Sequence, residues 1–172
     1  MTTTDLQPYE FDPYYGRYID KLSRLLELRK SFIEGKSNVV RFFETIPTEK
    51  LEYQYEPGKW NCKQILQHLI DTERVFQYRC FRIARNDKTE LAGFDQTIYI
   101  DPSNATQKPL DELIREFEIV REGSISLLNS LSDEDLMNIG TANNGDMSAR
   151  AAAFTITGHE IWHMEIISKK YL

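Results

Sequence analysis

Residues 148–170 read SARAAAFTITGHEIWHMEIISKK, and this stretch decides the fold. Ser148 is a typical helix N-cap, and Lys169 and Lys170 complement the negative end of a helix dipole. The side of this predicted helix that should face a core is formed by Ala152, Ile156, His159, His163, Ile166 and Ile167. An apolar stripe of this kind needs other helices to cover it. We therefore expect residues 148–170 to be one helix of a bundle.

Three further segments have helical periodicity, namely residues 14–46, 61–86 and 109–131. Asp12 and Pro13 mark the start of the first segment, and Pro47 marks its end. Asn61 and Gln64 have the spacing of a capping box at the start of the second segment. No strand pattern competes with these helices. The sequence therefore predicts an all-α fold, a four-helix bundle.

The connection between the second and third predicted helices is long. Residues 87–108 are rich in turn signals and contain Gly93 and Pro102. A crossover of this length lets the two helices run parallel. The chain of 172 residues can bury one substantial core and has the usual size of one domain. We therefore expect a single domain that spans residues 1–172.

Composition excludes several classes of function. The chain has 21 basic and 27 acidic residues and a formal net charge of −6, so it lacks a basic field that would attract nucleic acid. No run is long and apolar enough to span a bilayer, and residues 1–13 lack the apolar core of a signal peptide. We expect a cytoplasmic protein that binds neither nucleic acid nor membranes, with Cys62 and Cys80 reduced.

The only three histidines of the chain lie in two of the predicted helices. His159 and His163 are four residues apart, so both imidazoles project from one helix face and can reach a single ion. His68 of the second helix can complete a site with three nitrogen ligands and an open position. The alternative is that they are hydrogen-bonded core histidines. Because no histidine is left over, the pattern favours a site for one divalent metal ion.

Residues 159–163 also read HEIWH, the H-E-x-x-H motif of zinc metallopeptidases, in which the glutamate activates water. Those enzymes take a third ligand from downstream, and the nine residues after His163 offer only Glu165, so we do not expect a peptidase. Glu160 is a candidate general base, with a solvated or ion-paired carboxylate as the alternative. Glu160 and His163 also resemble half of a di-iron site, but the chain has no fourth histidine.

Three charged residues of the second predicted helix are further candidates for the site. Asp71 follows His68 by three residues and is a candidate for orienting an imidazole or taking part in proton transfer. Its alternative is a surface or capping role. For Arg79 and Arg82 two interpretations stay open, contact with an anionic substrate or the surface ion pairs that arginines commonly form.

Several segments together resemble one protein family. They include WNCKQILQHLIDTER at residues 60–74, the shorter stretches 76–79, 82–87, 91–95 and 140–143, and GHEIWH at 158–163. These segments resemble the DinB-like superfamily, and within it the branch of metal-dependent hydrolases related to YfiT. The resemblance extends from about Trp60 onward, and more loosely over the first helix.

The resemblance implies a four-helix bundle with up-down-down-up connectivity. It implies a divalent ion, zinc or nickel, held by one histidine of the second helix and two of the fourth. Those positions are His68, His159 and His163 in this chain. Related proteins use such a site to activate a low-molecular-weight thiol, and many are homodimers. The implied partners are therefore a small-molecule substrate, with a thiol among the candidates, and a second copy of the chain.

Three functions are compatible with these residues. The first is a metal-dependent hydrolase that lowers the pKa of water, with Glu160 or Asp71 handling the proton. The second is a metal-dependent thiol S-transferase that lowers the pKa of the thiol for attack on an electrophile. The third is a bundle that binds metal or small ligands without turnover.

Overall fold

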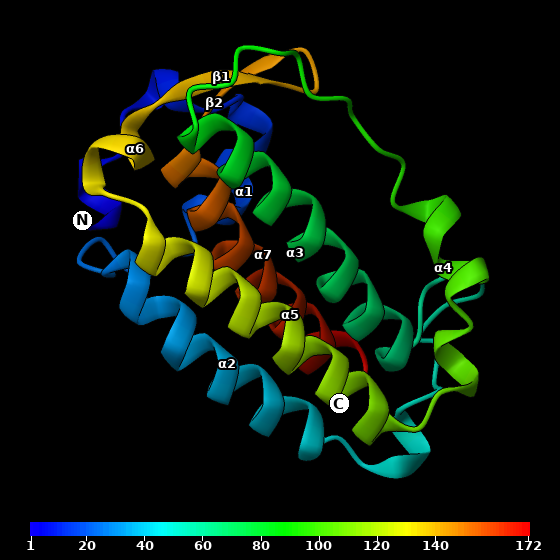
Figure 1. Ribbon diagram of the computed structural model, residues 1–172. Coiled ribbons are helices and arrows are strands. Elements are labelled where there is room, and N and C mark those ends of the chain that lie inside the picture. Colours follow the sequence, from blue (N-terminus) through cyan, green and yellow to red (C-terminus); the bar gives the residue numbers. More distant parts are fainter.

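Four long helices lie side by side in the computed structural model, which describes residues 1–172 (Figure 1). They are α2 (Leu28–Glu44), α3 (Cys62–Ala84), α5 (Leu110–Ser130) and α7 (Ala149–Lys170). The smaller elements are α1 (Pro13–Ile19), α4 (Thr97–Ser103), α6 (Asp133–Met137) and the antiparallel strands β1 (Ile139–Ala142) and β2 (Gly145–Ser148). No helix combines the length and apolar character needed to cross a membrane. The predicted helical bundle is confirmed.

The starts of α3 and α7 follow the predicted caps. The Asn61 side chain accepts a hydrogen bond from the backbone N–H of Gln64, and the Gln64 side chain accepts one from the backbone N–H of Asn61. This exchange completes a capping box. Ser148 Oγ accepts a hydrogen bond from the N–H of Ala151. These caps fix the first residues of the two helices that carry all three histidines.

The prediction of one continuous helix over residues 14–46 is wrong. The chain leaves α1 at Asp20 and starts α2 after Glu27, whose carboxylate accepts hydrogen bonds from the N–H groups of Arg29 and Lys30. A new N-cap of this kind starts a second helix. The side chain of Leu25, in the break, is 79% exposed, so the apolar stripe does not continue through it. The break lets α1 pack against α7.

The expectation that the chain contains no strands is also wrong. β1 and β2 pair antiparallel, with Ala142 opposite Gly145, so that Asn143 and Asn144 form a two-residue turn. Both asparagines have positive φ, 54° and 63°, which this tight hairpin turn requires. The predicted irregular crossover contains α4, and its Leu91 forms a parallel bridge with Ala142. The hairpin thus holds one end of the crossover against the bundle.

The apolar core has two parts along the bundle axis. One part includes Phe76 and Phe154, and the other includes Leu66 and Phe117. Near the junction of the two parts, α3, α5 and α7 carry a layer of buried polar residues: His68, Thr72, Glu73, Arg121, Ser124, Thr157, His159, Glu160 and His163. Burial of a polar side chain destabilises a fold unless the side chain is paired. This layer is therefore the part of the core where a functional site or a specific polar network is expected.

Two glycines allow close approach at the polar layer. A Cβ at Gly158 would lie 2.2 Å from the backbone oxygen of Tyr18, so only glycine lets α1 sit this close to α7. A Cβ at Gly35 would lie 2.4 Å from Glu160 Oε1. Close packing at both positions therefore brings α1 beside His159 and α2 beside Glu160.

Candidate metal centre

The three histidines converge inside the bundle, as the sequence predicts. His68 comes from α3, and His159 and His163 come from successive turns of α7. The Nε2 atoms of His68 and His163 each lie 3.0 Å from Nε2 of His159. All three side chains are buried, and their ligand atoms lie within 4.8 Å of one another. A tetrahedral site with metal–nitrogen bonds of about 2.0–2.1 Å needs nitrogen atoms about 3.3 Å apart, so this spacing fits one ion.

Burial keeps the three imidazoles neutral. It lowers the pKa of His68 to about 4 and that of His163 to about 3. Burial and the two neighbouring imidazoles hold the pKa of His159 well below its usual value. Neutral imidazole is the form that binds metal, because the ligating nitrogen needs a free lone pair. The site is therefore ready for a cation at neutral pH.

Hydrogen bonding alone does not satisfy the three converging nitrogens. Each Nε2 offers either one proton or one lone pair, so Nε2 of His159 cannot make a good hydrogen bond with both neighbours at once. A cation between the three atoms would accept all three lone pairs. Nδ1 of His68 lies 3.4 Å from Thr72 Oγ1, which can accept a hydrogen bond from Nδ1–H in the tautomer that leaves Nε2 free. The residues present thus fit a metal ion.

Aromatic side chains surround the imidazoles. The ring of Trp60 lies 4.8 Å from that of His68, Tyr18 lies 5.0 Å from His159, and Trp162 lies 4.7 Å from His163, measured between centroids. The last two contacts are edge-on, a favourable geometry for aromatic pairs. These rings restrict rotation of the imidazoles. Tyr18 has no sequence signal for this role, because its position depends on the break between α1 and α2.

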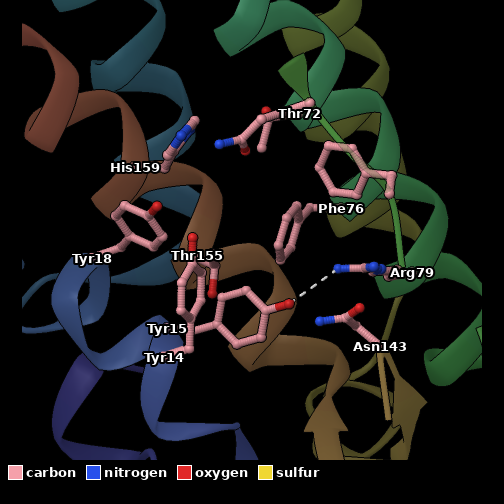
Figure 2. A pocket seen from close by; sticks show the side chains of 11 residues that line it. Tyr14, Tyr15, Tyr18, Thr72, Phe76, Arg79, Asn143, Thr155 and His159 are labelled. Carbon is pink, nitrogen blue, oxygen red and sulfur yellow. Dashed lines mark hydrogen bonds between the residues drawn. The ribbon is translucent and has the colours of Figure 1, made fainter. Parts of the chain in front are cut away.

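Two neighbouring cavities are lined by the histidines. The smaller has a volume of about 120 Å³ and is lined by His159, Thr72 and residues of α1 and α3 (Figure 2). The wider has a volume of about 380 Å³ and is lined by His68, His163 and both tryptophans. Tyr14, Tyr18 and Gln96 line both cavities. Each of the three histidines thus lines a cavity that can hold a small molecule.

Glu160 lies in the core beside a second charged cluster. Its Oε2 forms an ion pair with Nη2 of Arg121, whose Nε and Nη2 also donate to Glu73 at 2.8 and 2.9 Å. Burial raises the pKa of Glu160, and the charge of Arg121 opposes this shift. Glu160 is not among the ligand atoms of the histidine cluster. A cavity of about 10 Å³, the size of one water molecule, lies between Glu160, His159 and Thr72.

Asp71 lies in a network of charged residues at the surface of the bundle. Its carboxylate accepts hydrogen bonds from Gln67 and Arg74, both at 3.1 Å. Burial raises the pKa of this half-buried carboxyl group, and the contacts with Gln67 and Arg74 oppose the shift. Arg74 also pairs with Glu116 of α5. The structure thus places Asp71 in contacts between α3 and α5 and not among the histidine ligand atoms.

The two arginines with open interpretations have different surroundings. Arg82 forms an ion pair with Asp87 and donates to Tyr78, which is the surface role. Arg79 is fully buried and lines the smaller cavity. The sequence could not separate them, because both lie on the same helix, three residues apart.

Comparisons with known proteins agree with this fold. A curated protein of Oceanobacillus iheyensis, whose name proposes a metal-dependent hydrolase, is 27% identical over 119 residues, which cover 67% of each chain. YfiT from Bacillus subtilis, a four-helix bundle of unusual topology with a proposed metal-dependent hydrolase activity, superposes with a TM-score of 0.72 at 12% identity. The match covers 95% of this chain and 89% of YfiT.

A second solved structure has the same fold and a different named activity. The mycothiol-dependent maleylpyruvate isomerase superposes with a TM-score of 0.66 at 11% identity, over 96% of this chain and 62% of that one. The sequence profile of the DinB superfamily matches residues 32–167, which include α3, α5 and all three histidines. The chain belongs to the DinB superfamily.

Proposed function

We propose that the chain is a metal-dependent hydrolase in which His68, His159 and His163 hold one divalent transition-metal ion, zinc or nickel. The convergence of three buried, neutral Nε2 atoms carries this proposal. Three protein ligands leave a position for water or substrate, as catalytic zinc sites do. A divalent ion held there would act as a Lewis acid and lower the pKa of water towards about 7.

The surrounding residues support the ligands. Thr72 Oγ1 can accept a hydrogen bond from Nδ1–H of His68, in the tautomer that leaves Nε2 unprotonated for a metal. Tyr18 and Trp162 pack edge-on against the other two imidazoles and reduce the space for water beside them. Desolvation strengthens electrostatic interactions at the site, because the local dielectric is low. The chain therefore supplies ligands that are already oriented before any ion binds.

A second candidate is a metal-dependent S-transferase for a low-molecular-weight thiol. The presence of two cavities at one histidine cluster favours it, because a transferase must hold both a thiol and an electrophile. The wider cavity, lined by Arg17, Lys59 and Trp60, can accommodate a thiol that carries negative charge. The named activity of the mycothiol-dependent isomerase, which has the same fold, also supports this alternative.

A role of Glu160 or Asp71 in proton transfer remains a prediction. The buried ion pair of Glu160 with Arg121 supports a positioning role, in which Glu160 braces the turn of α7 that carries His159. The contacts of Asp71 with Gln67 and Arg74 support an ion-pairing role. In this proposal neither carboxylate is a metal ligand.

The proposal extends to the organisation of the bundle and its partners. The long connection from Arg85 to Pro109 supports an up-down-down-up order of the four long helices. The volumes of the two cavities support a small-molecule substrate. We also propose a homodimer, from the family resemblance of the sequence, and its mass in solution can be measured by light scattering.

Turnover screens separate the candidate functions. Metal-free protein and protein reconstituted with zinc or nickel are assayed with p-nitrophenyl acetate, and with monochlorobimane in the presence and absence of glutathione or cysteine. A hydrolase cleaves the ester when metal is bound and needs no thiol. A transferase conjugates bimane only when both metal and thiol are present. His163→Ala should abolish either activity, whereas Met164→Ala, at the next and half-buried position of α7, should retain it. Full metal content without any turnover would support the non-catalytic function.

A further inference from the structure

Arg79 differs from the other buried arginines of the chain. Arg121 pairs with Glu73 and Glu160, and Arg150 pairs with Glu10. The guanidinium of Arg79, in a residue that is 2% exposed, has no carboxylate within ion-pair distance. A buried charge without a counter-charge is expensive, and a fold retains one where something else compensates it.

The contacts of Arg79 leave most of its donors available. Nη1 donates to the hydroxyl of Tyr15 at 3.4 Å, and Nη2 donates to the backbone oxygen of Ala92 at 3.0 Å. A guanidinium has five N–H groups, so three of them remain for a ligand. The rings of Phe76 and Phe94 lie 5.0 and 5.6 Å from its central carbon. These neighbours hold the guanidinium in place but do not neutralise its charge.

The cavity beside Arg79 leads to the histidine cluster. Figure 2 shows His159 and Thr72 at one end of it, and Arg79 with Asn143 at the other. Thr72, Phe76 and Arg79 lie on one face of α3, and at about 1.5 Å per residue the first and last are about 10 Å apart along the helix axis. No acidic residue lines this cavity, and Arg79 is its only cation apart from any metal. A molecule in the cavity could therefore contact both ends.

We propose that this cavity binds the substrate as a compact monocarboxylate, with its carboxylate on Arg79 and its reactive group directed towards the histidine cluster. This inference deepens the proposed function and rests on it. A carboxylate matches the planar donors of a guanidinium with two parallel hydrogen bonds. The amide nitrogen of Asn143, which points towards the cavity in Figure 2, offers a further donor.

The size and lining of the cavity define the ligand further. A cavity of about 120 Å³ is slightly smaller than one of about 150 Å³ that holds benzene, so the ligand has roughly six heavy atoms. Tyr15, Phe76 and Phe94 surround an apolar body. A phosphate dianion would need more positive charge than the single guanidinium that lines this cavity. The structure therefore favours a short carboxylic acid over a phosphorylated compound.

Ligand binding to metal-free protein tests this assignment without reference to turnover. The probe is butyrate, and butyramide is the neutral control of the same shape. Calorimetry gives the dissociation constant of butyrate. The midpoint of thermal unfolding is then measured at a ligand concentration ten times that dissociation constant. We expect butyrate to give a saturable binding isotherm in calorimetry and to raise the unfolding midpoint of the wild-type protein by about 3–6 °C, and butyramide to have a much smaller effect.

Variants identify the residue that binds the anion. Arg79→Met removes the charge at similar volume and should abolish the response to butyrate. Arg115→Met makes the same change at an exposed position of α5 with no ion pair, and should keep the full response. Without ligand, Arg79→Met should unfold at the wild-type temperature or above it, because it removes an uncompensated buried charge. A loss of more than 4 °C would assign Arg79 a structural role and overturn the proposal.

Other outcomes are equally decisive. An absence of butyrate binding, or an equal response in wild-type protein and Arg79→Met, would overturn the carboxylate site. Metal content is measured on separate samples of the same proteins after reconstitution with zinc, because the metal ligands are unchanged in Arg79→Met. Normal metal content with no butyrate response would refute only the carboxylate site. Butyrate binding that depends on Arg79, in a protein that takes up no metal, would support the anion site and refute the metal-dependent function.

Discussion

The buried charge cluster around Arg121 gives a prediction whose magnitude follows from the structure. Arg121→Met removes a guanidinium that is 1% exposed and leaves Glu73 and Glu160 facing each other in the core. Removing one partner of a buried ion pair typically costs about 3–5 kcal/mol. For a chain of this length, each kcal/mol lowers the unfolding midpoint by about 2–4 °C. We therefore expect a loss of about 6–20 °C, measured by differential scanning calorimetry on metal-free protein.

Three further variants test whether the loss of stability is caused by charge. Arg115→Met is the control for the substitution itself and should unfold within 2 °C of the wild type. The triple variant Arg121→Met, Glu73→Gln and Glu160→Gln removes all three charges and should recover at least half of the loss. Arg79→Met, at an equally buried arginine without a carboxylate partner, should lose no stability. If Arg121→Met unfolds within 2 °C of Arg115→Met, our explanation of the polar layer is refuted.

Two other predictions concern the histidines and the contact between α1 and α7. Because burial lowers the pKa of His68 to about 4 and that of His163 to about 3, the unfolded chain binds more protons below pH 6.5. The free energy of unfolding of metal-free protein should therefore fall as the pH is lowered from 6.5 towards 4, by up to about 1.4 kcal/mol per pH unit for each histidine; urea titrations that show constant or rising stability would contradict this. Gly158→Ala places a Cβ 2.2 Å from the backbone of Tyr18 and should cost about 1–3 kcal/mol in the same titrations. Gly123→Ala, where the Cβ meets only the flexible end of Gln77, should be neutral or stabilising, and equal effects at the two glycines would show that the close approach does not matter.

The parts of the structure that the sequence predicted are those with local signals. α3 and α7 begin at the expected caps, Asn61 and Ser148, because capping depends on residues three positions apart. The histidine cluster follows from the spacing of His159 and His163 on the core-facing side of α7, which needs only one more ligand from a neighbouring helix.

The parts that were predicted wrongly depend on tertiary packing or on short turns. The break between α1 and α2 occurs where Leu22 is buried but Leu25 is exposed, and the apolar pattern alone does not distinguish the two. The hairpin has four residues in each strand, which is too short for a clear alternating pattern. The turn at Asn143 and Asn144, followed by Gly145, is the signal that could have revealed it.

The surroundings of the site were beyond the reach of sequence patterns. The Arg121 cluster joins α3, α5 and α7, so its members lie at least 39 residues apart in the chain. Tyr18 is likewise far from His159 in the chain, and its ring contacts His159 only because Gly158 lets the two backbones approach. The sequence left the same two interpretations open for Arg79 and Arg82. Only their burial in the structure assigns Arg79 to the cavity and Arg82 to the surface.

The central claim is that three histidines bind one metal ion in the polar layer of the bundle. X-ray absorption spectroscopy on untagged protein reconstituted with zinc, together with metal content by mass spectrometry, tests it most directly. We predict about one zinc per chain, with three imidazole nitrogens at about 2.0–2.1 Å, and a large loss of zinc in His159→Ala while the protein stays helical. A reconstituted protein that holds no zinc, or zinc content unchanged in His159→Ala, would contradict the claim.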